Sequence, residues 1–175
     1  MKKLLFIPIV WSITILFTAC GESRPDDLPV TLNASAEHSY TLIAPANNPQ
    51  SSTEIFRLDD FSGVSQYKKW IAKAEVISTS YIEITGITLD NVEMKDVSIS
   101  LGSDANKRLL LPGPITVNEK FMVDSAERLS FMQAIMNEII SKGSSNVVLK
   151  YTPGNNMVNE NTKLTIRMNT RFSFN

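Results

Sequence analysis

Residue types that carry most enzyme chemistry are scarce in this chain of 175 residues. His38 is the single histidine, and nothing around it in segment 34–39 has the pattern of an activated nucleophile. No serine lies in a Gly-x-Ser-x-Gly motif, and the seven glycines form no phosphate-binding loop. Zinc sites need clustered Cys and His ligands, which one residue of each type cannot supply. We therefore expect no catalytic centre, no metal and no cofactor, and we interpret His38 as an ordinary surface or strand-end residue.

Paired carboxylates remain a source of chemistry, because glycoside hydrolysis needs two of them roughly 5–10 Å apart. The pairs that the sequence offers are Asp59 with Asp60, Glu75 with Glu83, and Glu93 with Asp96. Adjacent residues of a strand point to opposite faces, and widely spaced residues lie far apart along it. Solvated acids are thus expected, and a polysaccharide hydrolase is the function supported least. Segment 155–161 is rich in oxygen ligands but lacks EF-hand spacing, so it is interpreted as a hairpin loop.

One reactive residue has a distinctive position. Cys20, the only cysteine, directly follows an apolar run of 16 residues, 4–19, which two lysines precede. A basic start, an apolar stretch and a small residue before the cleavage position are typical of a secretory signal peptide. The run is shorter than the about 20 residues that span a bilayer, and Pro8 interrupts it. In a plain secreted protein Cys20 would be a leftover free thiol, which is unusual.

Residues 1–20 resemble the lipobox-type signal of bacterial lipoproteins. Thr18 and Ala19 occupy the two small positions before the cysteine, while Phe17 stands where the family usually has leucine. The resemblance implies that residues 1–19 are a removed signal peptide and that Cys20 carries acyl chains such as palmitate, which anchor the chain to a membrane. Lipoproteins kept at the inner membrane often have aspartate directly after the cysteine. Its absence here indicates the outer membrane, with the periplasmic or surface face left open.

The chain after the anchor divides into a tether and one domain. Residues 20–29 are polar and contain two prolines, which is typical of a flexible tether, and residues 30–175 form one predicted domain. Removal of residues 1–19, which carry two lysines, changes the formal net charge from −1 to −3 and leaves 156 residues. A chain of that length buries enough surface for its own core. No basic stripe is present, so nucleic acid is not an expected partner.

Alternation of apolar and polar residues predicts that the domain is mainly β-structure. The alternation is clearest over residues 164–174, for which 146–152 is the expected hairpin partner. A second long run, 74–85, is expected to pair with 92–101, which changes its apolar phase near Lys95–Asp96 and therefore predicts a bulge there. Further short strands are predicted at 109–111 and 121–123, with weaker candidates at 30–32, 40–43 and 55–58.

One amphipathic helix is predicted at about residues 124–142. Asp124 is the expected N-cap, Glu127 has capping-box spacing, and Lys142-Gly143 predicts the end. A short helix is expected at about 64–71. The apolar side of the long helix comprises Leu129, Phe131, Met132, Ile135, Met136, Ile139 and Ile140.

Long strands with one inserted helix predict an antiparallel β-sandwich. The pattern loosely resembles immunoglobulin-like and fibronectin-like exported domains, a likeness of architecture that does not define a function.

Three further residues are candidate sites. Residues 124–126 are similar to a short O-glycosylation acceptor of some exported bacterial proteins, which implies a glycan on Ser125, although the same residues also open the predicted helix. Trp70 and Tyr67 are aromatic residues that either contact a sugar or peptide ligand or fill the core.

The expected function is therefore a non-catalytic binding, adhesion or assembly module, held to the membrane through lipidated Cys20, with an envelope protein or glycan as partner. An alternative is a carrier of a lipid-like apolar ligand held between the sheets and the helix 124–142. Phe131, Met132 and Met136 would line its cavity.

Overall fold

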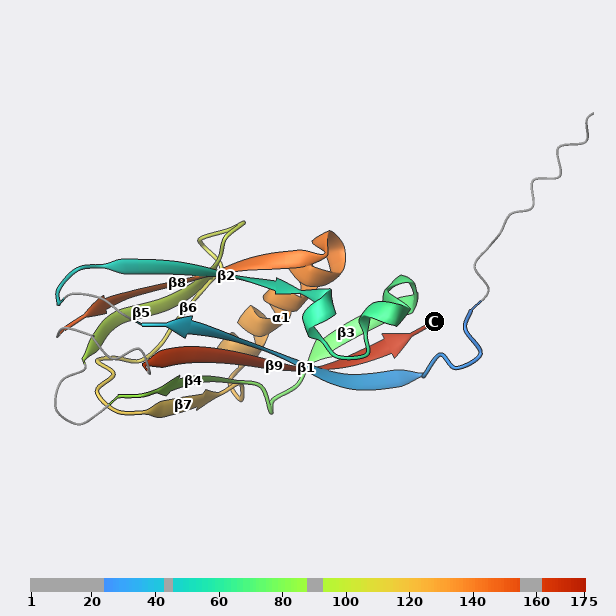
Figure 1. Cartoon of the computed structure of the whole chain (residues 1–175), viewed down its shortest axis with the longest axis horizontal. Coiled ribbons are helices and arrows are strands. Elements are labelled where there is room, and N and C mark those ends of the chain that lie inside the picture. Colours follow the sequence, from blue (N-terminus) through green and yellow to red (C-terminus); the bar gives the residue numbers. More distant parts are fainter. Residues whose placement is uncertain (1–23, 43–45, 88–92, 155–161) are drawn as a thin grey trace, which may run out of the picture.

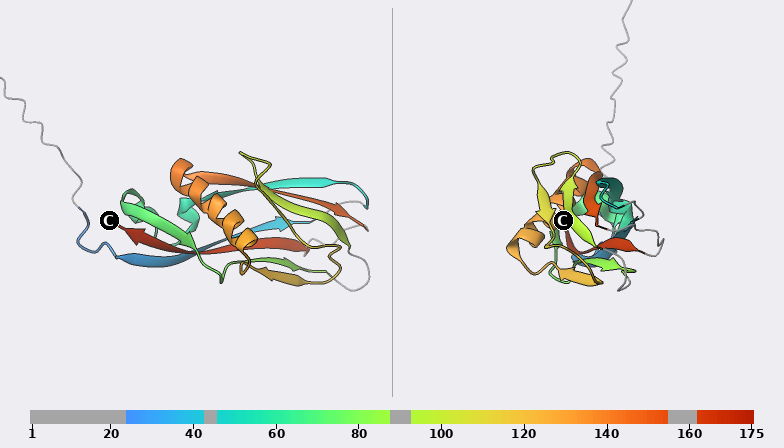
Figure 2. Two further views of the ribbon diagram at one scale, coloured as in Figure 1. Left: turned by 180° about the vertical axis from the view of Figure 1, so that it is seen from behind. Right: turned by 90° about the vertical axis from the view of Figure 1, so that its left-hand side faces the viewer.

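A computed structural model describes residues 24–42, 46–87, 93–154 and 162–175. Two antiparallel sheets pack face to face, and one long helix, α1 (Ala126–Lys142), runs beside them (Figure 1). The helix packs on a strand of each sheet, so it closes one side of the sandwich. This arrangement, also visible from behind in Figure 2, confirms the predicted mainly β-sandwich fold with one amphipathic helix.

The five-stranded sheet is organised around its longest strand, β9. On one edge β9 pairs with β1, and on the other it pairs with β4 and then β3; β7 follows β4. The predicted run 74–85 is thus two strands separated by a turn at 77–80. β9 buries alternate residues along its whole length, which confirms the alternation found in the sequence. The strands are β1 (Thr31–Thr41), β3 (Ile71–Val76), β4 (Tyr81–Thr85), β7 (Glu119–Met122) and β9 (Lys163–Phe174).

The four-stranded sheet corrects two predicted pairings. Its order is β2-β8-β5-β6, so β8 does not pair with β9, and β5 does not pair with β3 or β4. Alternation shows which face of a strand is buried, but strands that face each other across a core have the same pattern as neighbours in one sheet. The predicted bulge is confirmed, because the register shifts between Lys95 and Ser98 and Asp96 has φ 54°. The strands are β2 (Gln50–Arg57), β5 (Met94–Leu101), β6 (Arg108–Leu110) and β8 (Ser144–Pro153).

The start of α1 corrects the predicted cap. Ser125, in an extended conformation, is the N-cap, and its hydroxyl accepts a hydrogen bond from the Arg128 N–H at 3.2 Å. Asp124 stands one residue too early and pairs instead with the Arg128 guanidinium at 3.1 Å. Gly143 ends the helix in the left-handed conformation, φ 84°, as expected for a glycine after the last turn.

The helix interior is part of the core between the sheets. Met132 and Met136 are fully buried there, and Phe131 is 6% exposed. Leu129 and Ile140, expected on the buried side, are 38% and 41% exposed. The expected short helix is a 3-10 helix, η2 (Ser65–Trp70), and a second one, η1 (Leu58–Asp60), precedes it. Within the described ranges, no helix has the length and apolarity needed to cross a membrane.

Candidate binding site

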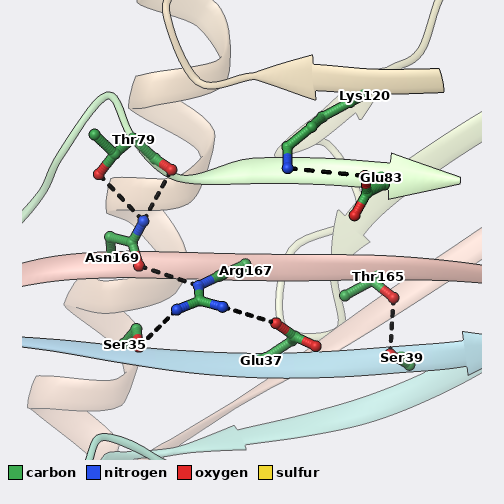
Figure 3. A network of polar contacts seen from close by, with 9 residues as sticks. All are labelled: Ser35, Glu37, Ser39, Thr79, Glu83, Lys120, Thr165, Arg167 and Asn169. Carbon is green, nitrogen blue, oxygen red and sulfur yellow. Dashed lines mark hydrogen bonds and ion pairs between the residues drawn. The ribbon is translucent and has the colours of Figure 1, made fainter.

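The outer face of the five-stranded sheet, which we call the outer sheet face, carries a network of polar side chains (Figure 3). In-register pairing of β1, β9 and β4 places their outward residues in rows across the strands. Arg167 on β9 is the centre of one row. It donates to Glu37 at 3.3 Å and Ser35 at 3.5 Å on β1, and to Asn169 at 3.4 Å on its own strand.

The next row of the outer sheet face is also paired. Lys120 lies 3.7 Å from the Glu83 carboxylate and 3.5 Å above the centre of the Tyr81 ring. Ser39 and Thr165 share a hydrogen bond of 2.8 Å between their hydroxyls. The charges in these rows thus have partners on adjacent strands, an arrangement that organises a solvated face and leaves little charge for a ligand.

The turn between β3 and β4 leaves a gap beside β9 that Ser80 fills. Its buried hydroxyl accepts from the Asn169 N–H at 2.9 Å and donates to the Asn169 carbonyl at 3.2 Å, so it replaces a missing strand residue. The Asn169 side-chain amide donates to the Thr79 carbonyl at 2.8 Å. Thr79 and Asn169 line a cleft of about 410 Å³ beside Ser80. Thr170, also in its lining, has a buried hydroxyl without a hydrogen-bond partner among the described residues.

A second cleft, which we call the α1 cleft, lies between the β5–β6 turn and the helix. Its volume is about 490 Å³, within the range of small-molecule sites. Glu127, Ser130, Ala134 and Asn137 follow each other at helical spacing and form one wall, and Phe131 is also in the lining. The opposite wall consists of Asn106, Lys107 and Arg108.

The turn that carries the cationic wall is held by Asp104. Its carbonyl accepts from the Lys107 N–H at 3.0 Å, and its carboxylate accepts from the Asn106 N–H at 3.1 Å. Leu101 at the end of β5 accepts from Asp104 and donates to Lys107 through the backbone. The backbone beneath Lys107 and Arg108 is therefore fixed before any ligand is present.

Gln133 attaches the helix to the open edge of β3. Its side-chain oxygen accepts from the Val76 N–H at 2.9 Å, and its nitrogen donates to the Ala74 carbonyl at 2.9 Å, as a neighbouring strand would. The same nitrogen donates to the side-chain oxygen of Asn137 at 2.9 Å. Gln133 is thus committed to the fold, while the Asn137 amide N–H groups have no partner within the described part of the chain.

Glu138 links α1, which forms one wall of the α1 cleft, to the β5–β6 turn that carries the other wall. It accepts from Lys142 at 2.5 Å and from Ser145 of β8 at 2.6 Å, and also from Ser103 in the β5–β6 turn. Its burial acts to raise the pKa of the carboxyl, but these hydrogen bonds outweigh that effect and hold the pKa at about 2. The carboxylate is therefore ionised at neutral pH and links turn, helix and sheet.

In contrast to Glu138, the charged side chains that line the α1 cleft are unpaired among the described residues. Lys107 and Arg108 on one wall and Glu127 on the other are exposed, and none of them forms an ion pair with another described residue. Arginine and lysine side chains in this state can form charge-assisted hydrogen bonds to an anion. The cleft thus offers two cations, one carboxylate, the side-chain amide of Asn106, the amide N–H groups of Asn137 and the Ser130 hydroxyl.

The predicted site residues lie apart from both surfaces or outside the described ranges. Cys20 and the signal segment 1–19 fall outside the described residues. Ser125 is exposed at the start of α1, where its oxygen caps the helix. Tyr67 and Trp70 are half-buried in η2 and pack against the edge of the core, with the Tyr67 ring edge-on to Phe174 at 5.6 Å.

His38 faces inward from the middle of β1. Its Nε2 lies 2.8 Å from an Asp60 carboxylate oxygen, and its ring lies 4.0 Å from that of Phe56. The Glu54 carboxylate is 3.7 Å from the other ring nitrogen. These contacts join β1 to β2 and η1 where the two sheets meet, so His38 is a partly buried link between sheets rather than the surface residue expected.

Known proteins add little to the geometry of the site. No family model and no curated protein matches the chain. Among solved structures it is similar to a protein of Desmodium yellow mottle tymovirus, with 9% identity over 87% of this chain and 95% of that one, and a TM-score of 0.36. A likeness this weak carries no argument about function.

Sequence reasoning missed the α1 cleft. Adjacent basic residues at 107–108 and polar residues spaced along the helix were visible signals. Each of these two signals by itself is typical of an ordinary solvated surface, because no local sequence pattern shows that the turn lies opposite the helix. Of the three residues expected to line the cavity of an apolar carrier, Phe131 lines the α1 cleft, whereas Met132 and Met136 line neither this cleft nor the cleft beside Ser80.

Proposed function

We propose that this chain is a lipid-anchored, non-catalytic binding module of the bacterial cell envelope, held at the outer membrane through Cys20. Its binding site is the α1 cleft, and its ligand is an acidic saccharide. The observation that carries the proposal is the pair of unpaired cations, Lys107 and Arg108, held on a fixed turn opposite a polar helix wall.

The chemistry of the wall supports a saccharide. The Asn106 amide and the Ser130 hydroxyl both donate and accept hydrogen bonds, and the Asn137 amide nitrogen donates them, which matches sugar hydroxyls. The two cations match a carboxylate, which an arginine can bind through two parallel hydrogen bonds. Glu127 adds an acceptor for a further hydroxyl.

A non-catalytic role agrees with the state of the acids described. Glu37 and Glu83 on the outer sheet face are each tied to a cation, and Glu138 is tied between elements. Glu127 is the single carboxylate lining the α1 cleft, whereas glycoside hydrolysis ordinarily uses two.

The binding test uses full-length lipidated protein in detergent, with galacturonate as the probe and galactose as its neutral counterpart. Calorimetric titration is expected to show galacturonate binding that Arg108→Gln or Lys107→Gln weakens about tenfold, the loss of one charge-assisted hydrogen bond. Lys150→Gln is the matched control, since it removes an exposed cation from β8 outside the cleft. Equal binding of galactose, or an equal loss in the control, would contradict the assignment of the ligand.

The anchor has a separate test. Palmitate labelling of growing cells should mark the wild-type chain and not Cys20→Ala, and intact mass should show that residues 1–19 are removed. An unmodified thiol at Cys20 would contradict the envelope anchor.

A further inference from the structure

The first described residues pack at one end of the sandwich. Leu28 is buried in the core cluster, and the carbonyl of Val30 accepts a hydrogen bond of 3.1 Å from the Phe174 N–H. The chain therefore enters the fold beside its own C-terminus, as Figures 1 and 2 show. β1 then runs from this end to the other.

The same end carries the 3-10 helix η2. Trp70 accepts a backbone hydrogen bond of 2.9 Å from Asn175, and Tyr67 donates to the Asp27 carboxylate at 3.3 Å. Trp70 is half-buried, Lys68 is exposed, and Val30 is 75% exposed, the highest value among the exposed large apolar side chains of the described residues. We call the surface of Val30 and Tyr67–Trp70 the anchor end.

Chain length limits how far the anchor end can lie from a membrane. Cys20 is four residues before Arg24, and an extended chain spans at most about 3.6 Å per residue, hence about 14 Å. β1 has 11 residues, so at about 3.3 Å per residue its far end lies roughly 35 Å further away. An acylated Cys20 would therefore hold the anchor end, and not the far end, next to the bilayer.

We propose that the anchor end rests on the headgroup region of the bilayer that holds Cys20, with Trp70 as the interfacial contact. This inference rests on the proposed lipidation of Cys20. Tryptophan and tyrosine favour the boundary between headgroups and acyl chains, and lysine extends its ammonium group toward phosphates.

The charges at the anchor end indicate which lipids suffice. Arg24, Lys68 and Lys69 are largely offset there by Asp26 and Asp27. Attraction to anionic lipid is therefore small, and the contact should form on zwitterionic phosphatidylcholine. Helix α1, which forms one wall of the α1 cleft, runs along the side of the sandwich, as Figure 2 shows, so the proposed membrane contact leaves that wall uncovered.

Tryptophan fluorescence can test the contact directly, because Trp70 is the only tryptophan after residue 19. Full-length lipidated protein is reconstituted into phosphatidylcholine vesicles and floated on a density gradient, with or without a nitroxide on the lipid headgroup. We expect flotation and strong quenching of Trp70 by the headgroup nitroxide. Flotation without quenching would overturn the contact and leave the anchor intact, whereas failure to float would overturn both.

A matched variant moves the reporter to the far end. Trp70→Phe combined with Ser51→Trp places tryptophan on an exposed position near the start of β2, where we expect flotation without quenching. Equal quenching at both positions would overturn the proposed orientation. Trp70→Phe alone should lack tryptophan emission; emission from Trp11 would show that residues 1–19 remain and would overturn the anchor on which the inference rests.

Discussion

The outer sheet face and the α1 cleft are both polar, but they use their polar groups in opposite ways. On the outer sheet face, Arg167 and Glu37 form an ion pair across adjacent strands, so both charges already have a partner. In the α1 cleft, Gln133 and Glu138 fix the walls, while Arg108 faces the space between them without an ionic partner among the described residues. A polar surface is thus a candidate site where its groups are held in place and still unpaired.

Ser80→Ala should give the largest effect, since it breaks the paired arrangement at its buried point. The change leaves the Asn169 N–H without a partner inside the sheet, which costs about 2–3 kcal/mol. Urea unfolding measures the loss. Ser39→Ala removes an exposed hydroxyl pair of the same face and should cost less than about 0.5 kcal/mol; similar losses for both variants would show that Ser80 does not fill the gap as described.

Glu138 gives the second largest effect, which depends on pH. Because the folded pKa is about 2 and lies below the unfolded value of about 4.3, the ionised carboxylate stabilises the fold above pH 4.3. That contribution is lost as the pH falls toward 2. Glu138→Gln should therefore be about 1–2 kcal/mol less stable than wild type at pH 7 and nearly equal to it at about pH 2.

Urea unfolding curves of wild type and Glu138→Gln, recorded between pH 7 and about pH 2, measure the difference in the free energy of unfolding. Glu127→Gln is the control on the same helix, since Glu127 is exposed and forms no ion pair with described residues. Its difference from wild type should stay near zero throughout. A constant deficit for Glu138→Gln would mean that the carboxylate charge does not link the walls.

The sequence predicted the individual helix and strands better than it predicted which strands pair with one another. The helix, the bulge near Asp96 and the alternation of β9 were all visible, because each depends on local periodicity or turn chemistry. The pairing of β8 with β2 and β5 was not, because strand order depends on contacts between residues far apart in the chain.

The candidate site was less visible than the fold for the same reason. Lys107 and Asn137 are 30 residues apart and belong to different elements. Gln133 has an ordinary position on a helix, and its bonding to the edge of β3 follows only from the packing of α1 against that strand. Likewise, His38 gave no sign that it faces Asp60 across the sandwich.

Thr170→Val tests the one buried hydroxyl that lacks a described partner. Valine has the same shape and no polar atom, so the variant should be more stable by about 1 kcal/mol. Chemical denaturation measures the change, with Thr165→Val on the exposed face of the same strand as control. A loss of stability in Thr170→Val would show that the hydroxyl has a partner, such as bound water, that the described residues do not supply.

The smallest expected effect is a difference in coupling energy between a charge pair on the outer sheet face and a charge pair in the α1 cleft. A double-mutant cycle on Arg167 and Glu37 should give a coupling of about 0.5 kcal/mol, since both side chains are partly exposed and solvent weakens their attraction. A cycle on Arg108 and Glu127, which face each other across the α1 cleft without an ion pair, should give a coupling near zero. A measurable Arg108–Glu127 coupling would mean that these charges already satisfy each other, and the contrast on which the binding proposal depends would then be lost.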